Sequence, residues 1–294
     1  MGKIKVHISL RNMSGAPKAF AALDGEKYEI SCRKSNAPMS DEEIIASIAD
    51  KDAVYFGIDP YYSAEILKGA KNLKLMTFAG VGFENYVDAA AAKKLGIEIK
   101  NAPGVNAVSV AELAVGLALD ALRKITFLNG ASERPVSREL KNMKIGLIGF
   151  GNINRAIYKI LKDGFGADVR FWNRDAATPL DIILSESDMI FIAITANEET
   201  QNFIDAEKIA KMKDGVILIN PARPSLVEEK ALLSALKSGK IAAAAQDGYY
   251  ESEYFKKLSS DRFIATPHIG ARTKEAHDAM DSKTVQNIVD FFES

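Results

Sequence analysis

KIGLIGFGNIN, residues 144–154, passes from an apolar strand through a glycine-rich turn into a helical pattern at Arg155–Lys162. Gly149 and Gly151 permit a tight turn, and they let a pyrophosphate approach the N-terminus of the helix that follows. The strand before the turn and the helix after it favour a dinucleotide site over a purely structural glycine turn. The predicted cofactor contacts here are Gly149, Phe150, Gly151, Asn152 and Ile153.

Asn154 stands where this fingerprint has its third glycine. A glycine at that position lets the helix pack closely against the strand. We therefore expect Asn154 to loosen the contact between helix and strand without removing the phosphate site.

The following strand ends in a pair of residues that bears on the choice of cofactor. NAD-binding turns are followed, about 20 positions on, by an acidic residue that binds the ribose 2′-hydroxyl. Asn173 occupies that place here, and Arg174 follows it. The missing carboxylate removes repulsion against a 2′-phosphate, and Arg174 can pair with that phosphate. The pair favours NADP over NAD, with an ordinary surface arginine as the alternative interpretation.

Short apolar strands alternate with helical patterns on both sides of the turn, which is typical of parallel βαβ units. The predicted strands form two series: first Ile4–Leu10, Ala53–Phe56, Leu75–Ala79 and Ile97–Lys100, then Lys144–Ile148, Asp168–Trp172, Met189–Ile194, Val216–Asn220, Ile241–Ala245 and Phe263–Thr266. Predicted helices include Ser40–Ala49, which begins with a Ser40/Glu43 capping box, Val108–Lys124 and the amphipathic Ala271–Ser294. The pattern predicts an α/β protein of two doubly wound lobes.

Composition excludes several classes of protein. The 294 residues carry 38 Lys and Arg against 39 Asp and Glu, so no large basic field is available to bind nucleic acid or an acidic membrane surface. No segment reaches the ~18 uncharged apolar residues of a membrane span. Cys32 is the single cysteine, which rules out an internal disulfide, argues against a cysteine-based metal site, and fits a reducing cytoplasm.

Further motifs follow the later strands and also lie in the first lobe. They are Ile219–Glu229 (INPARPSLVEE), Ala243–Asp247 (AAAQD), Ala265–Ala271 (ATPHIGA) and, in the first lobe, Phe78–Asn85 (FAGVGFEN), with Asn101–Gly104 and Val110–Glu112 after it. Together with the glycine turn, and in their order along the chain, these motifs resemble those of the D-isomer-specific 2-hydroxyacid dehydrogenases. The resemblance covers nearly the whole chain, most clearly from about residue 50 onward. It implies a Rossmann cofactor domain inserted into a flavodoxin-like substrate domain.

The reaction that the resemblance implies needs the residue types found in these motifs. Reduction of a 2-keto acid requires a hydride at C2, a proton for the carbonyl oxygen and a clamp on the carboxylate. Arg223 suits the clamp, because its planar guanidinium binds a carboxylate through two hydrogen bonds. Backbone N–H groups of Gly80 and Val81 are expected to bind the other carboxylate oxygen. His268 suits the proton donor, because histidine ordinarily titrates near neutral pH.

The remaining site assignments also follow from the resemblance. Asp247 is expected near the nicotinamide carboxamide, and Thr195 and Ala222 are expected to contact the cofactor. The family also has a catalytic glutamate five residues after this aspartate, but that position is Ser252, flanked by Glu251 and Glu253. Either a one-residue slip brings one of these two glutamates to the histidine, or the acid–base pair is incomplete.

The sequence contains two other histidines. His7 lies in the first strand and His277 on the last helix, and both are expected to be structural.

The leading hypothesis is NAD(P)H-dependent reduction of a small, unphosphorylated 2-keto acid of the glyoxylate or hydroxypyruvate type. The alternatives are 3-phosphoglycerate dehydrogenase activity, for which Arg33, Lys34 and Arg272 offer positive charge, a dehydrogenase-like module that senses nucleotide, and a structural Rossmann protein.

The motifs also predict how the chain is divided and assembled. The substrate domain is expected at residues 1–100 and 269–294, and the cofactor domain at residues 101–268, which leaves no room for an appended regulatory domain. Members of the family are usually dimers joined through the cofactor lobe. We therefore expect a homodimer whose interface lies along residues 108–142.

Overall fold

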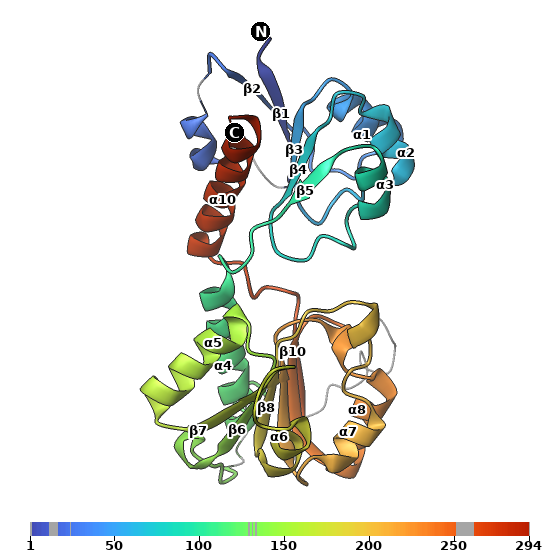
Figure 1. Cartoon of the computed structure of the whole chain (residues 1–294). Helices are drawn as coiled ribbons and strands as arrows, with labels where there is room; N and C mark the ends of the chain where they lie inside the picture. Colours follow the sequence, from blue (N-terminus) through green and yellow to red (C-terminus); the bar gives the residue numbers. More distant parts are fainter. Residues whose placement is uncertain are drawn as a thin grey trace. The chain divides into compact units, whose positions relative to one another are not determined.

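The computed structural model describes residues 2–11, 17–23, 25–128, 130, 132, 134–250 and 262–293. They form two compact units, shown in Figure 1. Unit 1 comprises Met1–Asn106 and Thr273–Ser294, and unit 2 comprises Ala107–Arg272. These boundaries lie six and four residues further along the chain than those expected from the sequence.

Unit 1 contains a parallel sheet that, among the described residues, has five strands in the order β2-β1-β3-β4-β5. The strands are β1 (Ile4–Ile8), β2 (Tyr28–Cys32), β3 (Ala53–Phe56), β4 (Leu75–Phe78) and β5 (Glu98–Lys100). This 2-1-3-4-5 order is that of flavodoxin-like folds. The flavodoxin-like expectation for the first lobe is therefore confirmed.

Helices cover both faces of the unit 1 sheet (Figure 1). On one face lie α1 (Asp41–Ile48), α2 (Ala64–Gly69) and α3 (Ala89–Lys94), and on the other lie the short 3₁₀ helix η1 (Lys18–Ala22) and α10 (Lys274–Phe292). Every residue of β3 and β4 is buried, as expected for strands covered on two sides. The Ser40/Glu43 capping box that begins α1 is present as predicted.

Unit 2 contains a parallel sheet whose described strands follow the order β11-β10-β9-β8-β6-β7. They are β6 (Lys144–Ile148), β7 (Asp168–Trp172), β8 (Met189–Ile192), β9 (Val216–Asn220), β10 (Ile241–Asp247) and β11 (Phe263–Thr266). The classic Rossmann sheet has a further strand outside its second one. Here only residues 173–179 separate β7 from the next helix, so β7 is the edge strand of the described sheet.

Two layers of helices enclose the unit 2 sheet. The helices are α4 (Ala107–Arg123), α5 (Asn152–Lys159), α6 (Leu180–Glu186), α7 (Ala206–Lys211) and α8 (Glu229–Ser238). Alternate residues of β9 separate the layers: Ile217 and Ile219 pack with α4 and α5, whereas Val216 and Leu218 pack with α6, α7 and α8. Short irregular helices complete the unit: the 3₁₀ helices η2 (Leu140–Asn142), η4 (Glu198–Thr200) and η5 (Pro224–Leu226), and the π-helix η3 (Ile160–Gly164).

The α/β class with two parallel sheets is thus confirmed, and several boundaries differ. Strand β2 is not among the predicted strands, and β10 extends two residues beyond its predicted end, to Asp247. The helix after the glycine turn begins at Asn152 rather than Arg155. Among the described residues, none of the helices is both long enough and apolar enough for a membrane crossing.

Candidate active site

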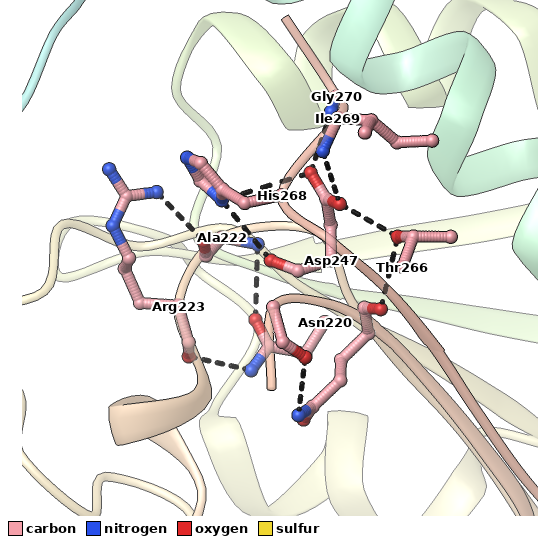
Figure 2. A network of polar contacts seen from close by, with 10 residues as sticks. Asn220, Ala222, Arg223, Asp247, Thr266, His268, Ile269 and Gly270 are labelled. Carbon is pink, nitrogen blue, oxygen red and sulfur yellow. Dashed lines mark hydrogen bonds and ion pairs between the residues drawn. The ribbon is translucent and has the colours of Figure 1, made fainter. Parts of the chain in front are cut away.

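The C-terminal ends of β9, β10 and β11 meet at one edge of the unit 2 sheet, because the three strands are neighbouring and parallel. Arg223 follows β9, Asp247 ends β10, and His268 follows β11. Figure 2 draws the three side chains in one view: His268 contacts Asp247, and the Arg223 side chain contacts the Ala222 carbonyl. In open α/β sheets, this edge is where ligands bind.

Asn220 shapes the turn that carries Arg223. Its side chain is buried, with Nδ2 donating to the Arg223 carbonyl at 2.7 Å and Oδ1 accepting from the Ala222 N–H at 3.1 Å. Nη1 of Arg223 donates to the Ala222 carbonyl at 2.9 Å. No carboxylate of the described residues forms an ion pair with this guanidinium. Its remaining donors are therefore available to a ligand.

His268 has an unusual backbone and a half-exposed ring. Its φ is +55°, in the left-handed region that non-glycine residues rarely enter. The His268 side chain is 47% exposed, and its Nδ1 lies 3.3 Å from the Asp247 carbonyl oxygen and 3.9 Å from Asp247 Oδ2. Glu251 and Glu253, the sequence-predicted carboxylate partners of this histidine, lie outside the described residues.

The glycine turn after β6 needs the glycine at 149. Its φ is +86°, and a Cβ there would lie 2.6 Å from the Ala193 carbonyl oxygen. The ring of the next residue, Phe150, stacks on Phe171 of β7 with centroids 3.7 Å apart. The loop between β6 and α5 is therefore held against β7 on one side and the end of β8 on the other.

The expectation that Asn154 loosens the contact between helix and strand is wrong. Asn154 is fully buried, and its Nδ2 donates to the carbonyl oxygens of Ile148 and Gly149 at 2.9 and 2.8 Å. These two bonds tie α5 to the end of β6 directly. The side-chain amide thus supplies a connection that a glycine could not.

The loop and α5 offer room and donors for a dinucleotide. A Cβ at Gly151 would meet no atom within 4 Å, and among the described residues no side chain caps the first N–H groups of α5. Such N–H groups attract a phosphate. At the end of β7, Oδ1 of Asn173 is shielded from solvent and lacks a hydrogen-bond partner among the described residues. These features fit a bound nicotinamide dinucleotide.

Thr195 lies in the loop after β8, and Arg174, which follows β7, pairs with a residue of the same connection. Arg174 Nη2 lies 3.3 Å from Glu199 Oε2, and both side chains are more than three-quarters exposed. An exposed pair of this kind contributes only about 0–1 kcal/mol. The Thr195 carbonyl accepts a hydrogen bond from Thr200 Oγ1 at 2.7 Å, which holds the loop in place.

In unit 1, one of the two N–H groups expected to bind substrate is already used. The Gly80 N–H donates to the Phe78 carbonyl at 2.8 Å, so the tight turn after β4 consumes it. Among the described residues no such bond engages the Val81 N–H, while the Val81 carbonyl accepts from Asn101 Nδ2. Binding of a substrate carboxylate by Gly80 and Val81 stays a prediction, with the Val81 N–H as the donor that the turn leaves unused.

His7 in unit 1 behaves as a core residue. His7 on β1 is 4% exposed, and its Nδ1 lies 3.0 Å from Ser31 Oγ. Burial, reinforced by the nearby charges of Lys51 and Arg33, lowers the pKa of His7 from 6.5 to about 4. His7 is thus uncharged at neutral pH, as a structural role requires.

The sequence reasoning did not single out Asn220 or Thr266. An Asn before Pro at a strand end is a turn signal that could have identified Asn220. Thr266 Oγ1 donates to Asp247 Oδ1 at 2.7 Å, a contact between neighbouring strands that no local motif announces.

Comparisons with known proteins agree with this geometry. The family described as "D-isomer specific 2-hydroxyacid dehydrogenase, NAD binding domain" matches residues 115–270, more than half of the chain. The chain belongs to the D-isomer-specific 2-hydroxyacid dehydrogenases. It is an oxidoreductase with a nicotinamide-dinucleotide domain.

Individual relatives cover almost the whole chain. The hydroxypyruvate reductase of Thermotoga maritima is 35% identical, over 90% of this chain and 94% of its own. The glyoxylate reductase of Pyrococcus furiosus is 30% identical, over 90% of this chain and 87% of its own. Among solved structures, NAD⁺-bound 3-phosphoglycerate dehydrogenase of Entamoeba histolytica superimposes with a TM-score of 0.87 at 25% identity, covering 100% of this chain and 96% of that one.

Proposed function

We propose that the chain reduces a small, unphosphorylated 2-keto acid to the D-2-hydroxy acid, with glyoxylate or hydroxypyruvate as the type of substrate. The observation that carries this proposal is that Arg223 and His268 follow β9 and β11 at the same edge of one parallel sheet, with an Arg223 guanidinium that no described carboxylate engages. Hydroxypyruvate and glyoxylate reductases among the relatives support the substrate class.

Each residue has a defined part in this reaction. Arg223 binds the substrate carboxylate through two hydrogen bonds and polarises the neighbouring carbonyl. The Val81 N–H is the proposed second contact to that carboxylate. A bound reduced nicotinamide supplies the hydride that goes to C2. His268 donates the proton from Nε2 to the carbonyl oxygen and is left neutral.

The structure also bears on the phosphorylated alternative. Arg33, one of the three bases considered for a substrate phosphate, is 7% exposed and already donates to Asp59 and to the carbonyls of Ser35 and Ala37. A guanidinium engaged in this way has little left to offer a phosphate. Arg33 is therefore a poor phosphate ligand, whereas Lys34 and Arg272 are exposed.

Oxidation of NADH and NADPH, followed by absorbance, tests the proposed activity with glyoxylate, hydroxypyruvate, pyruvate and 3-phosphohydroxypyruvate. We expect the highest kcat/KM with hydroxypyruvate or glyoxylate. A higher value with 3-phosphohydroxypyruvate would replace the proposal by phosphoglycerate dehydrogenase activity. Tight nucleotide binding without turnover of any of the four acids would favour a nucleotide-sensing module.

We propose NADP(H) as the preferred cofactor. The support is an amide, Asn173, in place of the ribose-binding carboxylate, and an exposed arginine, Arg174, held only by a weak ion pair. A 2′-phosphate offers Arg174 a stronger partner than the Glu199 carboxylate, because it carries more charge and more acceptor oxygens. A higher kcat/KM with NADH than with NADPH would refute this preference.

We propose a homodimer through residues 108–142. Large apolar side chains lie exposed in this stretch, at Val108 (61%), Ile125 (60%) and Val136 (100%). Burial of such side chains against a second copy would stabilise a dimer. Analytical ultracentrifugation checks this, and a monomer at micromolar concentration would contradict it.

Location in a reducing cytoplasm stays a prediction.

A further inference from the structure

The glycine-rich turn between β6 and α5 is fastened to the strands on both sides of it. The Gly149 N–H donates to the Trp172 carbonyl at the end of β7 at 2.8 Å. The Ala193 N–H, just after β8, donates to the Ile148 carbonyl at 3.0 Å. These backbone bonds fix where the turn begins, and they leave the Gly149 carbonyl to another partner.

Asn154 of α5 is that partner. Its side chain is 0% exposed, and Nδ2 donates to the Gly149 carbonyl at 2.8 Å and to the Ile148 carbonyl at 2.9 Å. Among the described residues no other donor reaches the Gly149 carbonyl. Asn154 Oδ1 is also shielded and lacks a partner among those residues, which costs free energy. A buried amide with an unpaired oxygen is thus retained where the fingerprint has glycine, which points to a role for Nδ2.

The bond to Gly149 sets the direction of the peptide that follows. In a planar trans peptide the C=O and the N–H point in opposite directions. Because the Gly149 carbonyl points to the buried Asn154, the Phe150 N–H points away from it. The Phe150 carbonyl likewise accepts from Arg155 Nε at 3.0 Å, so the Gly151 N–H points away from Arg155. Two side chains of α5 therefore orient two successive peptides of the turn.

The N–H groups turned outward in this way are available to a ligand. Among the described residues no hydrogen bond engages the N–H of Phe150 or of Gly151. The N–H groups of Asn152 and Ile153 begin α5 and have no partner within the helix. Successive N–H groups that face one way attract an anion, and the dipole of α5 adds to that attraction. The first turn of α5 has no acidic side chain to oppose it.

We propose that Asn154 is a positioning residue for the cofactor: its amide holds the Gly149–Phe150 peptide so that the N–H groups of the turn face the pyrophosphate of the dinucleotide. The inference rests on the nicotinamide-dinucleotide domain that the family match shows, and it does not depend on the proposed 2-keto acid. It differs from a role in packing α5 on the sheet, which buried apolar residues such as Ile157 perform.

Asn154→Leu removes the donor and keeps a side chain of similar size and branching. We expect the Kd values for NADH, NADPH and ADP each to rise about tenfold, or about 1.4 kcal/mol. The rise should be equal because the three ligands share the adenosine diphosphate group that the turn would bind. Isothermal titration calorimetry without a keto acid measures all three values. Asn154→Ala removes the same donor and should give the same rise if Asn154→Leu does not fold.

Ile157→Ala is the matched control. Ile157 is as buried as Asn154 and lies three residues further along α5, but its side chain cannot bond to the turn. The variant should unfold at a lower urea concentration, with the three Kd values within about twofold of wild type. Equal rises in Ile157→Ala and Asn154→Leu would assign the effect to helix packing and overturn the proposal. Wild-type Kd values in Asn154→Leu, or a rise for NADH and NADPH without one for ADP, would overturn it as well.

Hydrogen exchange in the wild-type protein, followed by NMR, tests the direction of the N–H groups. We expect the backbone amides of Phe150 and Gly151 to exchange at least about tenfold more slowly with saturating ADP than without it. The side-chain amide hydrogens of Asn154, assigned by their loss in Asn154→Leu, should exchange slowly in both states. Two unprotected backbone amides in the ADP complex would contradict the inference. Because no keto acid is used, these results stay informative even if the proposed substrate is wrong.

Discussion

Two arginines follow strand ends in the two units, and they are used in opposite ways. Arg33, after β2 in unit 1, has a side chain that is 2% exposed, and it donates to Ser35, Ala37 and Asp59. Arg223, after β9 in unit 2, is partly exposed, and among the described residues its side chain donates one hydrogen bond, to the Ala222 carbonyl. All three nitrogens of the Arg33 guanidinium donate to its own protein, whereas only one nitrogen of the Arg223 guanidinium does so among the described residues.

The histidines of the two units show the same contrast. His7 is buried and held uncharged, whereas the His268 side chain is 47% exposed and sits on a strained backbone. Residue type alone does not separate a structural group from a reactive one. What distinguishes a reactive group from a structural one is unused hydrogen-bonding capacity at an accessible position. This difference can be tested by substitution.

The largest expected effect is that of Arg223→Gln. Loss of the carboxylate clamp should lower kcat/KM for the 2-keto acid about 10³-fold, or about 4 kcal/mol of transition-state stabilisation. The free energy of unfolding should change by less than about 0.5 kcal/mol, because the residue makes few contacts with its own protein. Steady-state kinetics and urea denaturation measure the two quantities. A kcat/KM near that of wild type would remove Arg223 from the site.

Arg33→Met should show the reverse pattern. Asp59 loses its nearer cation, and the Ser35 and Ala37 carbonyls lose a donor, so we expect a loss of about 3 kcal/mol in the free energy of unfolding. This is the lower end of the range for breaking a buried pair, because Asp59 keeps Arg11 at 3.3 Å. The kcat/KM of the folded fraction should stay within about twofold of wild type. A variant that is as stable as wild type but binds substrate weakly would contradict the contrast between Arg33 and Arg223.

The buried histidine should make stability depend on pH. The pKa of His7 is about 4 in the folded chain against 6.5 unfolded, so the unfolded chain takes up a proton first as the pH falls. Stability from this group is therefore present above pH 6.5 and is lost as the pH falls toward 4, by about 2 kcal/mol between pH 7 and pH 5. Urea denaturation at both pH values measures the loss.

Two substitutions isolate the contribution of His7. His7→Leu cannot titrate, so the loss of stability between pH 7 and pH 5 should shrink by about 2 kcal/mol. His277→Gln, on the exposed side of α10, is the matched control and should keep most of the wild-type loss. Equal pH dependence of wild type and His7→Leu would show that the burial of His7 has no such consequence.

The smallest effect is expected for the exposed arginine. Arg174→Gln should lower the ratio of kcat/KM for NADPH over NADH about tenfold, which corresponds to about 1.4 kcal/mol. Glu199→Gln frees Arg174 from its ion pair and removes a negative charge near the proposed phosphate, so the ratio should rise about threefold. An unchanged ratio in both variants would leave Arg174 as an ordinary surface residue.

Much of the fold can be predicted from strands that are buried and clearly bounded. Strands β6 and β9 match their predicted ranges because each is a largely buried, mostly apolar run that ends at a turn or at polar residues. Strand β2, with the sequence YEISC, alternates apolar and polar residues over only five positions at a sheet edge. So short an alternation is hard to distinguish from the surrounding loops. The segment becomes a strand because it pairs with β1.

The three residues Arg223, Asp247 and His268 were singled out through the family resemblance, and strand order explains why they end at one edge of the sheet. Arg223, Asp247 and His268 follow successive strands, and neighbouring parallel strands end at one edge. The roles of Asn154, Asn220 and Thr266 could not be predicted, because each depends on which backbone or side-chain atom its polar group reaches. The sequence likewise could not indicate that the turn after β4 consumes the Gly80 N–H.

Helix α10 has a consequence for synthesis on the ribosome. Val285 and Ile288 on this helix complete the core that Val6, Ile8 and Leu75 begin, yet α10 follows every other described element in the chain. At about 5–20 residues per second, roughly 10–40 s separate the synthesis of β4 from that of α10. Unit 2 is one continuous segment and is complete before α10 emerges. During that interval only η1 is available to cover this apolar face of the first sheet, so the part that α10 will cover stays exposed.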